Sequence, residues 1–163
     1  MSVTRTADLL PVALPQAQTA LRGRDREANE LARLLVDPAT RLLTLVGPGG
    51  VGKTRLALHV ATEAVDAFAG DVAFVPLASI REPRLVLLAI GGAVGFASNP
   101  DETYEAGLGE HLRQRRALIV LDNLEQVLDG ASALGRLLDA APGITVLATS
   151  QVPLDLPGER IFA

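Results

Sequence analysis

The chain has 163 residues, of which 48% are hydrophobic and 3% aromatic, and it carries a formal charge of −4 from 15 basic and 19 acidic residues. This length suits one domain with a sizeable core, and the aliphatic composition favours helices packed on a sheet over an aromatic-rich β-sandwich. No basic block could neutralise a run of phosphates, so nucleic acid is not an expected partner of this segment. The lack of cysteine excludes disulfides and thiolate metal sites, and it fits a cytoplasmic location without requiring one.

Residues 1–20 contain prolines among scattered Thr, Gln and Ala, without a sustained period, and are expected to be a flexible leader. Two apolar stretches, 9–14 and 85–97, are shorter than the roughly 20 residues that a membrane-spanning helix needs. A signal peptide is the alternative for the first stretch, but Pro11 interrupts it and no clustered basic region accompanies it. No membrane partner is therefore expected, and a single domain is predicted over residues 21–163.

Strand and helix patterns alternate through this domain. A helix is expected from Asp25, as its cap, to the pair Asp37-Pro38, which stops it. Short apolar runs without polar alternation predict buried parallel strands at 42–46, 117–121 and 144–148, with a fourth candidate at 72–75 whose Pro76 suits a sheet edge. Helical spacing lies between them at 56–68, 85–90, 104–112 and 134–141. The alternation predicts an α/β fold.

The stretch GPGGVGKTRL directly follows the first predicted strand and precedes an amphipathic helix. Its first eight residues match the phosphate-loop pattern G-x-x-x-x-G-K-[ST]. Glycines let successive backbone N–H groups turn toward a phosphate, and the helix adds the positive end of its dipole. We therefore predict that a nucleotide binds the loop residues Gly47, Pro48, Gly49, Gly50, Val51, Gly52, Lys53, Thr54 and Arg55.

Lys53 is the only lysine in the chain, and the other basic positions are all arginine. An ammonium is a compact point charge that can reach between β- and γ-phosphates, whereas a guanidinium is a broad planar fork. The alternative is a glycine-rich turn that carries a solvated lysine and binds nothing. The use of lysine at this one position favours a bound polyphosphate.

Thr54 and Asp122 are the predicted magnesium ligands, and Lys53 and Asp122 are the candidate catalytic residues. In P-loop enzymes a loop hydroxyl and an acid at the end of another buried strand hold Mg²⁺. Asp122 follows the run 117–121, and the carboxyl ends of parallel strands open on the ligand crevice. The alternative for Asp122 is to cap a helix that starts at Leu124.

Six stretches carry a family resemblance across residues 21–163: LRGRDRE, LTLVGPGGVGKTRLAL, VAFVPLASI, ALIVLDNLEQVL, ITVLATS and LPGERIF. Together they resemble the ATPase module of large bacterial, typically actinobacterial, transcriptional regulators of the LuxR or SARP type, within the STAND branch of P-loop ATPases that includes NB-ARC domains. The resemblance implies a three-layer P-loop NTPase sandwich with sheet order 5-1-4-3-2, in which the fifth strand begins at Ile161. It also implies that helical and winged-helix subdomains follow, so we expect this domain to be incomplete.

The resemblance also implies roles for single residues. Arg24, in the Gly23-Arg24 pair, would contact the adenine and ribose of ATP or ADP, although as a bare sequence feature it is equally a helix entry with a solvated arginine. Strongly hydrolysing relatives place a glutamate as general base directly after the metal-side aspartate, where this chain has Asn123, and an amide cannot take that proton. Glu125 is expected on a helix surface rather than in the crevice. Gln151 stands where related proteins often carry an arginine that senses the γ-phosphate.

Two further groups receive no functional role. His59 and His111 lie on different predicted helices without an acidic partner at ligand spacing, so both are expected to be surface residues. Arg113, Arg115 and Arg116 form the densest basic cluster and are expected to be a solvated helix end.

Three functions fit these residues. The first is a switch that binds ATP or ADP with Mg²⁺, hydrolyses slowly at best and reports to regulatory domains absent from this chain, with a nucleotide-dependent oligomer in the full-length protein. The second is a small-molecule kinase, which also needs an acceptor pocket, and no candidate lid is evident. The third is a degenerate interaction module that no longer binds nucleotide. The intact loop and its lysine favour the switch.

Overall fold

The computed structural model describes residues 14–15 and 23–163, so the predicted leader lies outside the described residues except for positions 14 and 15. The strands are β1 (Leu42–Val46), β2 (Val72–Pro76), β3 (Ala117–Asp122), β4 (Ile144–Ser150) and β5 (Glu159–Phe162). The helices are α1 (Asp25–Val36), α2 (Lys53–Glu63), α3 (Leu85–Ala93), α4 (Tyr104–Leu112) and α5 (Ala131–Ala140), with 3₁₀ segments η2 (Asp66–Phe68) and η3 (Leu124–Gly130).

The strands pair in the order β2-β3-β4-β1-β5, and every pair is parallel. Counted from β5 this is the expected order 5-1-4-3-2, with β4 between β1 and β3 and with β2 at an edge. The fifth strand begins earlier than expected, because Glu159 and Arg160 already pair with Leu42 and Leu43. Only β4 separates β1 from β3, so the segments that follow these strands meet at one edge of the sheet.

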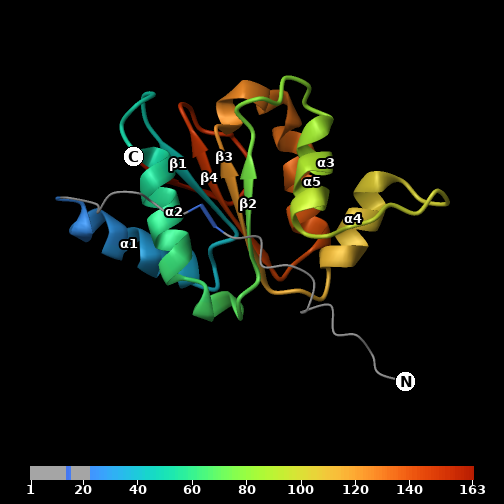
Figure 1. The fold of residues 1–163 in the computed structure, drawn as a ribbon, viewed down its shortest axis with the longest axis horizontal. Helices are drawn as coiled ribbons and strands as arrows, with labels where there is room; N and C mark the ends of the chain where they lie inside the picture. The colour runs from blue at the N-terminus through green and yellow to red at the C-terminus, as the bar shows by residue number, and fades with distance from the viewer. Residues whose placement is uncertain (1–13, 16–22) are drawn as a thin grey trace.

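Helices cover both faces of the sheet, with α1 and α2 on one side and α3, α4 and α5 on the other (Figure 1). Successive strand residues face opposite layers, so β3 sends Leu118 and Val120 toward α1 and α2, and Ile119 and Leu121 toward the other helices. All four side chains are fully buried. Burial on both faces explains why the strands lack polar alternation, and the three-layer α/β sandwich is confirmed.

Some element boundaries differ from the sequence predictions. Arg24 occupies the cap position of α1, and Asp25 lies in the first turn, where its charge still favours the helix dipole. The helix predicted over 56–68 ends at Glu63, and Phe68 is buried in the separate segment η2. The 3₁₀ segment η3 precedes α5, and it is kinked at Val127, which has non-helical angles of φ −141° and ψ 43°. The differences concern local geometry at helix ends and leave the architecture unchanged.

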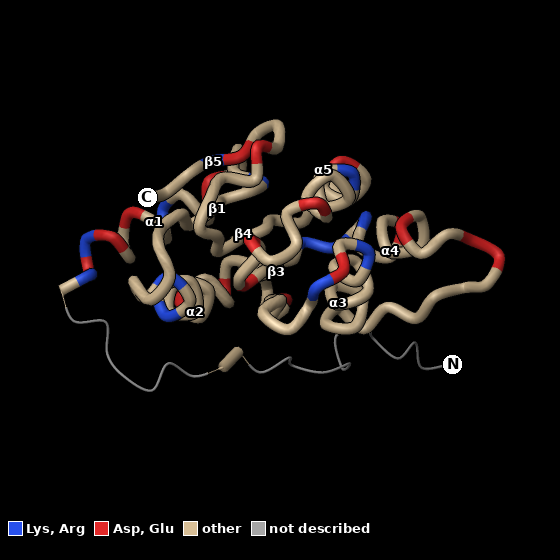
Figure 2. The backbone as a smooth tube through the Cα atoms, turned by 90° about the horizontal axis from the view of Figure 1, so that it is seen from above, with Lys and Arg blue, Asp and Glu red and all other residues tan. Residues whose placement is uncertain are grey.

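Two surface properties of the described part of the chain bear on its partners. No helix within residues 14–15 and 23–163 is long and apolar enough to cross a membrane. Lys and Arg are interspersed with Asp and Glu when the molecule is seen from above (Figure 2). Such a mixture produces no strong field of one sign that would attract a polyanion over a distance.

Candidate functional site

Residues 47–52 form a tight loop between β1 and α2. Gly50 and Gly52 have φ angles of 82° and 84°, a region that disfavours any residue with a side chain. Gly52 is the N-cap of α2, no side chain caps this helix, and its first turn contains no acidic residue. The N–H groups at the start of α2 are therefore available to an anion in front of the loop.

Lys53 is the first residue of α2, and its side chain lies back across the loop. Its ammonium donates hydrogen bonds to the carbonyl oxygens of Gly47 (2.7 Å) and Pro48 (2.8 Å). A Cβ at Gly47 would lie 3.7 Å from Cδ of Lys53 and 3.3 Å from Cγ2 of Val51. The ammonium thus sits over a closely packed loop on neutral acceptors, which a phosphate can replace with a stronger charge-assisted contact.

Thr54 and Asp122, the predicted magnesium ligands, are brought together between α2 and β3. The Thr54 hydroxyl donates to Oδ1 of Asp122 at 2.7 Å. Asp122 is 6% exposed and, within the described residues, forms no ion pair. A buried carboxylate without a cation is costly, and a hydroxyl with a carboxylate is the oxygen donor set that Mg²⁺ prefers. Asp122 does not cap η3, because Asn123 holds that position and makes no side-chain cap.

Thr149, near the end of β4, is a site residue that sequence reasoning missed. Its hydroxyl donates to the same Oδ1 of Asp122 at 2.6 Å and accepts from the backbone N–H of Asn123 at 2.9 Å. Threonine is ordinary strand composition, and β4 contains a second one at Thr145, so the residue type gave no signal. The position of Thr149 could have given a signal, because it lies at the carboxyl end of the strand expected beside Asp122.

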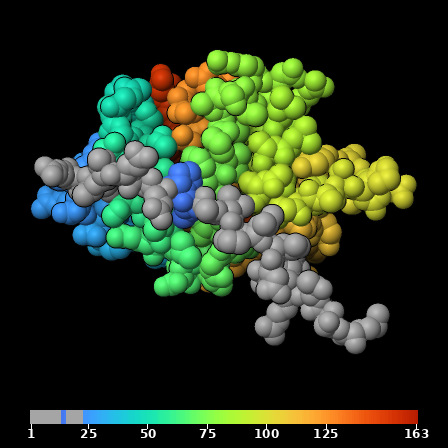
Figure 3. Space-filling model, in the orientation of Figure 1, coloured from blue at the N-terminus to red at the C-terminus, as the bar shows by residue number. Residues whose placement is uncertain are grey.

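The residues that follow Thr149 contact the phosphate loop. The Ser150 carbonyl oxygen accepts from Gly47 N–H at 3.2 Å. The side-chain nitrogen of Gln151 lies 3.5 Å from the point that a Cβ on Gly49 would occupy. The teal loop segment and the red residues after β4 lie beside each other at the top of the molecule (Figure 3). The end of β4 therefore contacts both halves of the candidate site.

Glu125 differs from its expected place on a helix surface. The residue is half-buried, and its Oε2 atom is buried without a hydrogen-bond partner among the described residues. The reason is that η3 is a 3₁₀ segment that contacts both β4 and α5 rather than a free surface helix. The preceding Asn123 has a left-handed φ of 61°, so the chain turns sharply between Asp122 and Glu125.

Two arginines lie near the phosphate loop, and they differ in their contacts. Arg24 Nη1 lies 3.2 Å from the point that a Cβ on Gly52 would occupy, while its Nε lies 3.6 Å from the carboxylate of Glu27. Arg24 is therefore a helix-entry residue and a neighbour of the phosphate loop at the same time. Arg55 is exposed on α2.

The expectations for three basic residues are wrong. His59, expected to have no acidic partner at ligand spacing, has its Nε2 3.3 Å from the Glu63 carboxylate on the same helix. His111 is half-buried, and its Nε2 lies 3.2 Å from the Val94 carbonyl oxygen and 3.0 Å from Arg115 Nη1. Arg115 donates two hydrogen bonds to the Asp71 carboxylate, at 3.0 and 2.7 Å, because pairing of β2 with β3 brings these segments together. Arg113 is exposed, as expected. Among the described residues no three His, Cys, Asp or Glu side chains gather into a metal-binding group.

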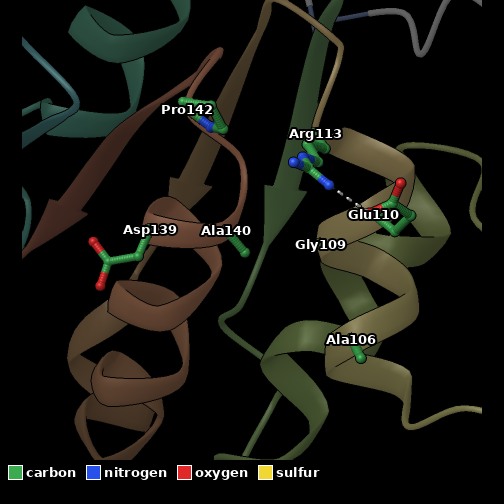
Figure 4. A pocket seen from close by; sticks show the side chains of 7 residues that line it. All are labelled: Ala106, Gly109, Glu110, Arg113, Asp139, Ala140 and Pro142. Carbon is green, nitrogen blue, oxygen red and sulfur yellow. Dashed lines mark ion pairs between the residues drawn. The ribbon is translucent and has the colours of Figure 1, made fainter.

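A shallow groove between α4 and α5 is lined by Ala106, Gly109, Glu110, Arg113, Asp139, Ala140 and Pro142 (Figure 4). Arg113 and Glu110 form an ion pair at 3.5 Å on one wall, and Asp139 lies on the other. The segment 139–142 precedes β4, so the groove lies toward the amino ends of the strands, whereas the phosphate loop follows the carboxyl end of β1. The groove is therefore badly placed to present an acceptor to a phosphate beside Lys53.

No family model matches the chain. It is 35% identical over 165 aligned positions to the regulatory protein AfsR of Streptomyces griseus, an alignment that covers 94% of this chain and 16% of AfsR. A Mycobacterium tuberculosis protein named as an HTH-type transcriptional regulator is 42% identical over 120 residues, which cover 73% of this chain and 13% of that protein. The chain thus spans less than a fifth of the length of either relative.

Solved structures with the same fold include ATPases. The Aeropyrum pernix ORC2 protein, in its ADPNP–ADP complexes, superposes with a TM-score of 0.64 at 21% identity over 83% of this chain and 43% of that chain. A STAND protein with a tetratricopeptide repeat sensor from Pyrococcus horikoshii gives a TM-score of 0.54 at 18% identity over 90% of this chain and 23% of that chain. The predicted P-loop NTPase fold and the resemblance to actinobacterial regulators are confirmed.

Proposed function

We propose that this chain, which has the P-loop ATPase fold and resembles a segment of actinobacterial transcriptional regulators, is the nucleotide-binding switch module of such a regulator. The observation that carries the proposal is the buried Asp122 carboxylate, which the Thr54 hydroxyl contacts at 2.7 Å at the N-terminus of α2. A buried carboxylate without an ion-pair partner lowers the stability of the fold, and a bound cation at this point would compensate that cost.

Different groups of the site contact different parts of ATP or ADP. Backbone N–H groups from Gly49 to Arg55, where the loop passes into α2, surround the phosphates, and Lys53 moves its ammonium from two carbonyl oxygens to phosphate oxygens. Thr54 and Asp122 hold Mg²⁺, which supplies positive charge between the phosphates and the carboxylate. Arg24, whose Nη1 lies near Gly52, would contact the ribose and base.

Slow hydrolysis is part of the proposal. The position after Asp122 carries Asn123, whose amide cannot take a proton from water, and Gln151 over Gly49 is neutral where a charge would favour phosphoryl transfer. Lys53 and Asp122 therefore act mainly in binding. The kinase alternative lacks an acceptor site at this edge, since the groove between α4 and α5 is at the other one. The assembled pair of Thr54 and Asp122 argues against a degenerate module.

Longer relatives suggest how the switch is used. This chain matches only a small part of the regulators, so the signal passes to domains that lie outside it. We propose that these domains, rather than this one, contact DNA. A nucleotide-dependent oligomer of the full-length protein and a cytoplasmic location complete the proposal, and the regulatory role in the names of the relatives supports the location.

The test is the thermal midpoint of the chain with and without Mg·ATP or Mg·ADP. Ligand at 100 times its Kd adds about 2.7 kcal/mol, which raises the midpoint of a domain of this size by roughly 5–10 °C. Lys53→Ala should abolish the shift, and Arg113→Ala, which changes an exposed basic residue remote from the loop, should retain it. Equal responses of wild type and Lys53→Ala at millimolar nucleotide would refute the proposal.

A further inference from the structure

Asp122 is held from two sides by hydroxyl groups. Thr54 approaches from α2 and Thr149 from β4, and both donate to the same oxygen, Oδ1, at 2.7 and 2.6 Å. Thr149 is fully buried, and its strand is paired directly with β3, so its hydroxyl is fixed by a sheet and not by a loop. In the described part of the chain these hydroxyls leave Oδ2 of Asp122 free to face a cation or its bound water.

The hydrogen bonds of Thr149 also fix the direction of its proton. The hydroxyl oxygen accepts from Asn123 N–H at 2.9 Å, which leaves its single proton for Asp122. Asn123 has a φ of 61° and begins the turn into η3. One hydroxyl therefore secures both the carboxylate and the backbone turn that follows it.

The geometry points to Thr149 as a positioning residue that orients Asp122 for Mg²⁺, a role that rests on the proposed nucleotide site. Thr149 acts through Asp122 and does not itself contact nucleotide or metal. Without the hydroxyl the carboxylate can rotate, and loss of such an outer hydrogen-bond partner typically weakens a metal site by roughly 10- to 100-fold. The part of nucleotide affinity that depends on Mg²⁺ should fall, whereas the part that Lys53 and the loop provide should not.

The experiment is titration calorimetry of ADP into the whole chain, once with Mg²⁺ and once with EDTA. The ratio of the two Kd values is the magnesium enhancement. We expect Thr149→Val, which keeps the shape but not the hydroxyl, to reduce the enhancement by roughly tenfold and to leave the Kd in EDTA at its wild-type value. Thr149→Ser should restore the enhancement. Thr145→Val, the same exchange at another buried threonine of β4, is the matched control and should change neither constant.

The outcomes separate this role from the proposed function. A folded Thr149→Val protein with full magnesium enhancement overturns the role while nucleotide binding stands. An equal loss of affinity in EDTA and in Mg²⁺ also overturns it, because that pattern reports general damage. A wild-type chain that binds no ADP in either buffer refutes the proposed function and this role with it. If Thr149→Val does not fold, Thr149→Cys carries the same comparison, since a thiol is only a weak donor.

Discussion

The affinity for nucleotide that we propose for Lys53 depends on the shape of its head group as well as on its charge. The ammonium fits between the carbonyl oxygens of Gly47 and Pro48, at 2.7 and 2.8 Å, in a loop where a Cβ at Gly47 would already be crowded. A guanidinium is wider and planar. We therefore expect Lys53→Arg to lose most of the affinity for Mg·ATP although the charge is unchanged, as measured by fluorescence polarisation of a labelled ATP.

The control for this exchange is Arg113→Lys, which alters an exposed arginine remote from the loop in the reverse direction and should bind as wild type does. Unchanged affinity of Lys53→Arg would show that any cation suffices at this position. In that case the single lysine would carry no information about the ligand.

The sequence predicted the meeting of Thr54 with Asp122 because both follow buried strands of a parallel sheet, whose carboxyl ends share an edge. It did not predict Thr149, whose contact with Asp122 spans 27 residues, because the expected strand order places β4 beside β3 but does not show which side chain its hydroxyl contacts. The ion pair of Arg115 with Asp71, 44 residues apart, was missed for the same reason. Composition and period specify faces of elements, whereas partners of single polar side chains depend on tertiary packing.

At the scale of elements, the junction of loop and α2 depends on Gly52. Its φ of 84° is unfavourable for an L-residue, and a Cβ would approach Arg24 Nη1 to 3.2 Å. Gly52→Ala should therefore lower the stability by about 1–2 kcal/mol and the thermal midpoint by a few degrees, and weaken nucleotide binding.

Gly92→Ala provides the opposite case. Gly92 lies in α3, is exposed, and has nothing within 4 Å of the point that a Cβ would occupy. Alanine there should stabilise the chain by roughly 0.4–1 kcal/mol, because it reduces the freedom of the unfolded state. A thermal midpoint that falls equally in both variants would contradict the argument from backbone angle.

The contact of α4 with α5 includes an ion pair whose strength depends on pH. Arg136 donates to Glu105 at 2.6 Å and holds the pKa of that carboxyl below its ordinary value of 4.5. The stabilisation is therefore present above pH 4.5 and is lost as the pH falls through the lowered pKa. Because the pair is largely exposed, we expect Glu105→Gln to cost only about 0.5 kcal/mol at pH 7.

Thermal midpoints of wild type and Glu105→Gln, measured at pH 7 and pH 3, check this. The difference between the two proteins should be small at pH 7 and should shrink as the pH is lowered toward 3 and the Glu105 carboxylate takes up its proton. Glu30→Gln, at an exposed position of α1, serves as the control. A difference that is the same at both pH values would mean that the glutamine disturbs packing instead of removing a charge.

At the scale of the whole molecule, the alternation of apolar runs with helical spacing was sufficient to predict the layers and the class of fold. The strand order came from the family resemblance, because nothing in the composition of β4 places it between β1 and β3. The kink at Val127, inside η3, was not predicted, since helical spacing of apolar residues continues across Val127 although its backbone angles are not helical. The same spacing of apolar residues can therefore occur on different backbone conformations, because tertiary contacts determine which conformation forms.

The rate of ATP hydrolysis depends on residues from several elements of the molecule. The proposed site would bind phosphates, but it has Asn123 instead of a glutamate after Asp122 and the neutral Gln151 instead of a charged residue. We expect phosphate release from Mg·ATP by the wild-type chain to match that of Lys53→Ala, in a coupled phosphate assay. Rapid release by wild type alone would show that another group, of which the half-buried Glu125 is the first candidate, activates water.

The proposed site holds one nucleotide through Lys53, Thr54 and Asp122. Titration calorimetry of the chain with Mg·ATP tests it most directly, because it counts sites and measures affinity together. We predict one site per chain in the wild type, no detectable binding for Lys53→Ala, and weaker binding with a reduced dependence on Mg²⁺ for Asp122→Asn. Absence of binding by the wild type, or identical binding by all three proteins, would contradict the claim.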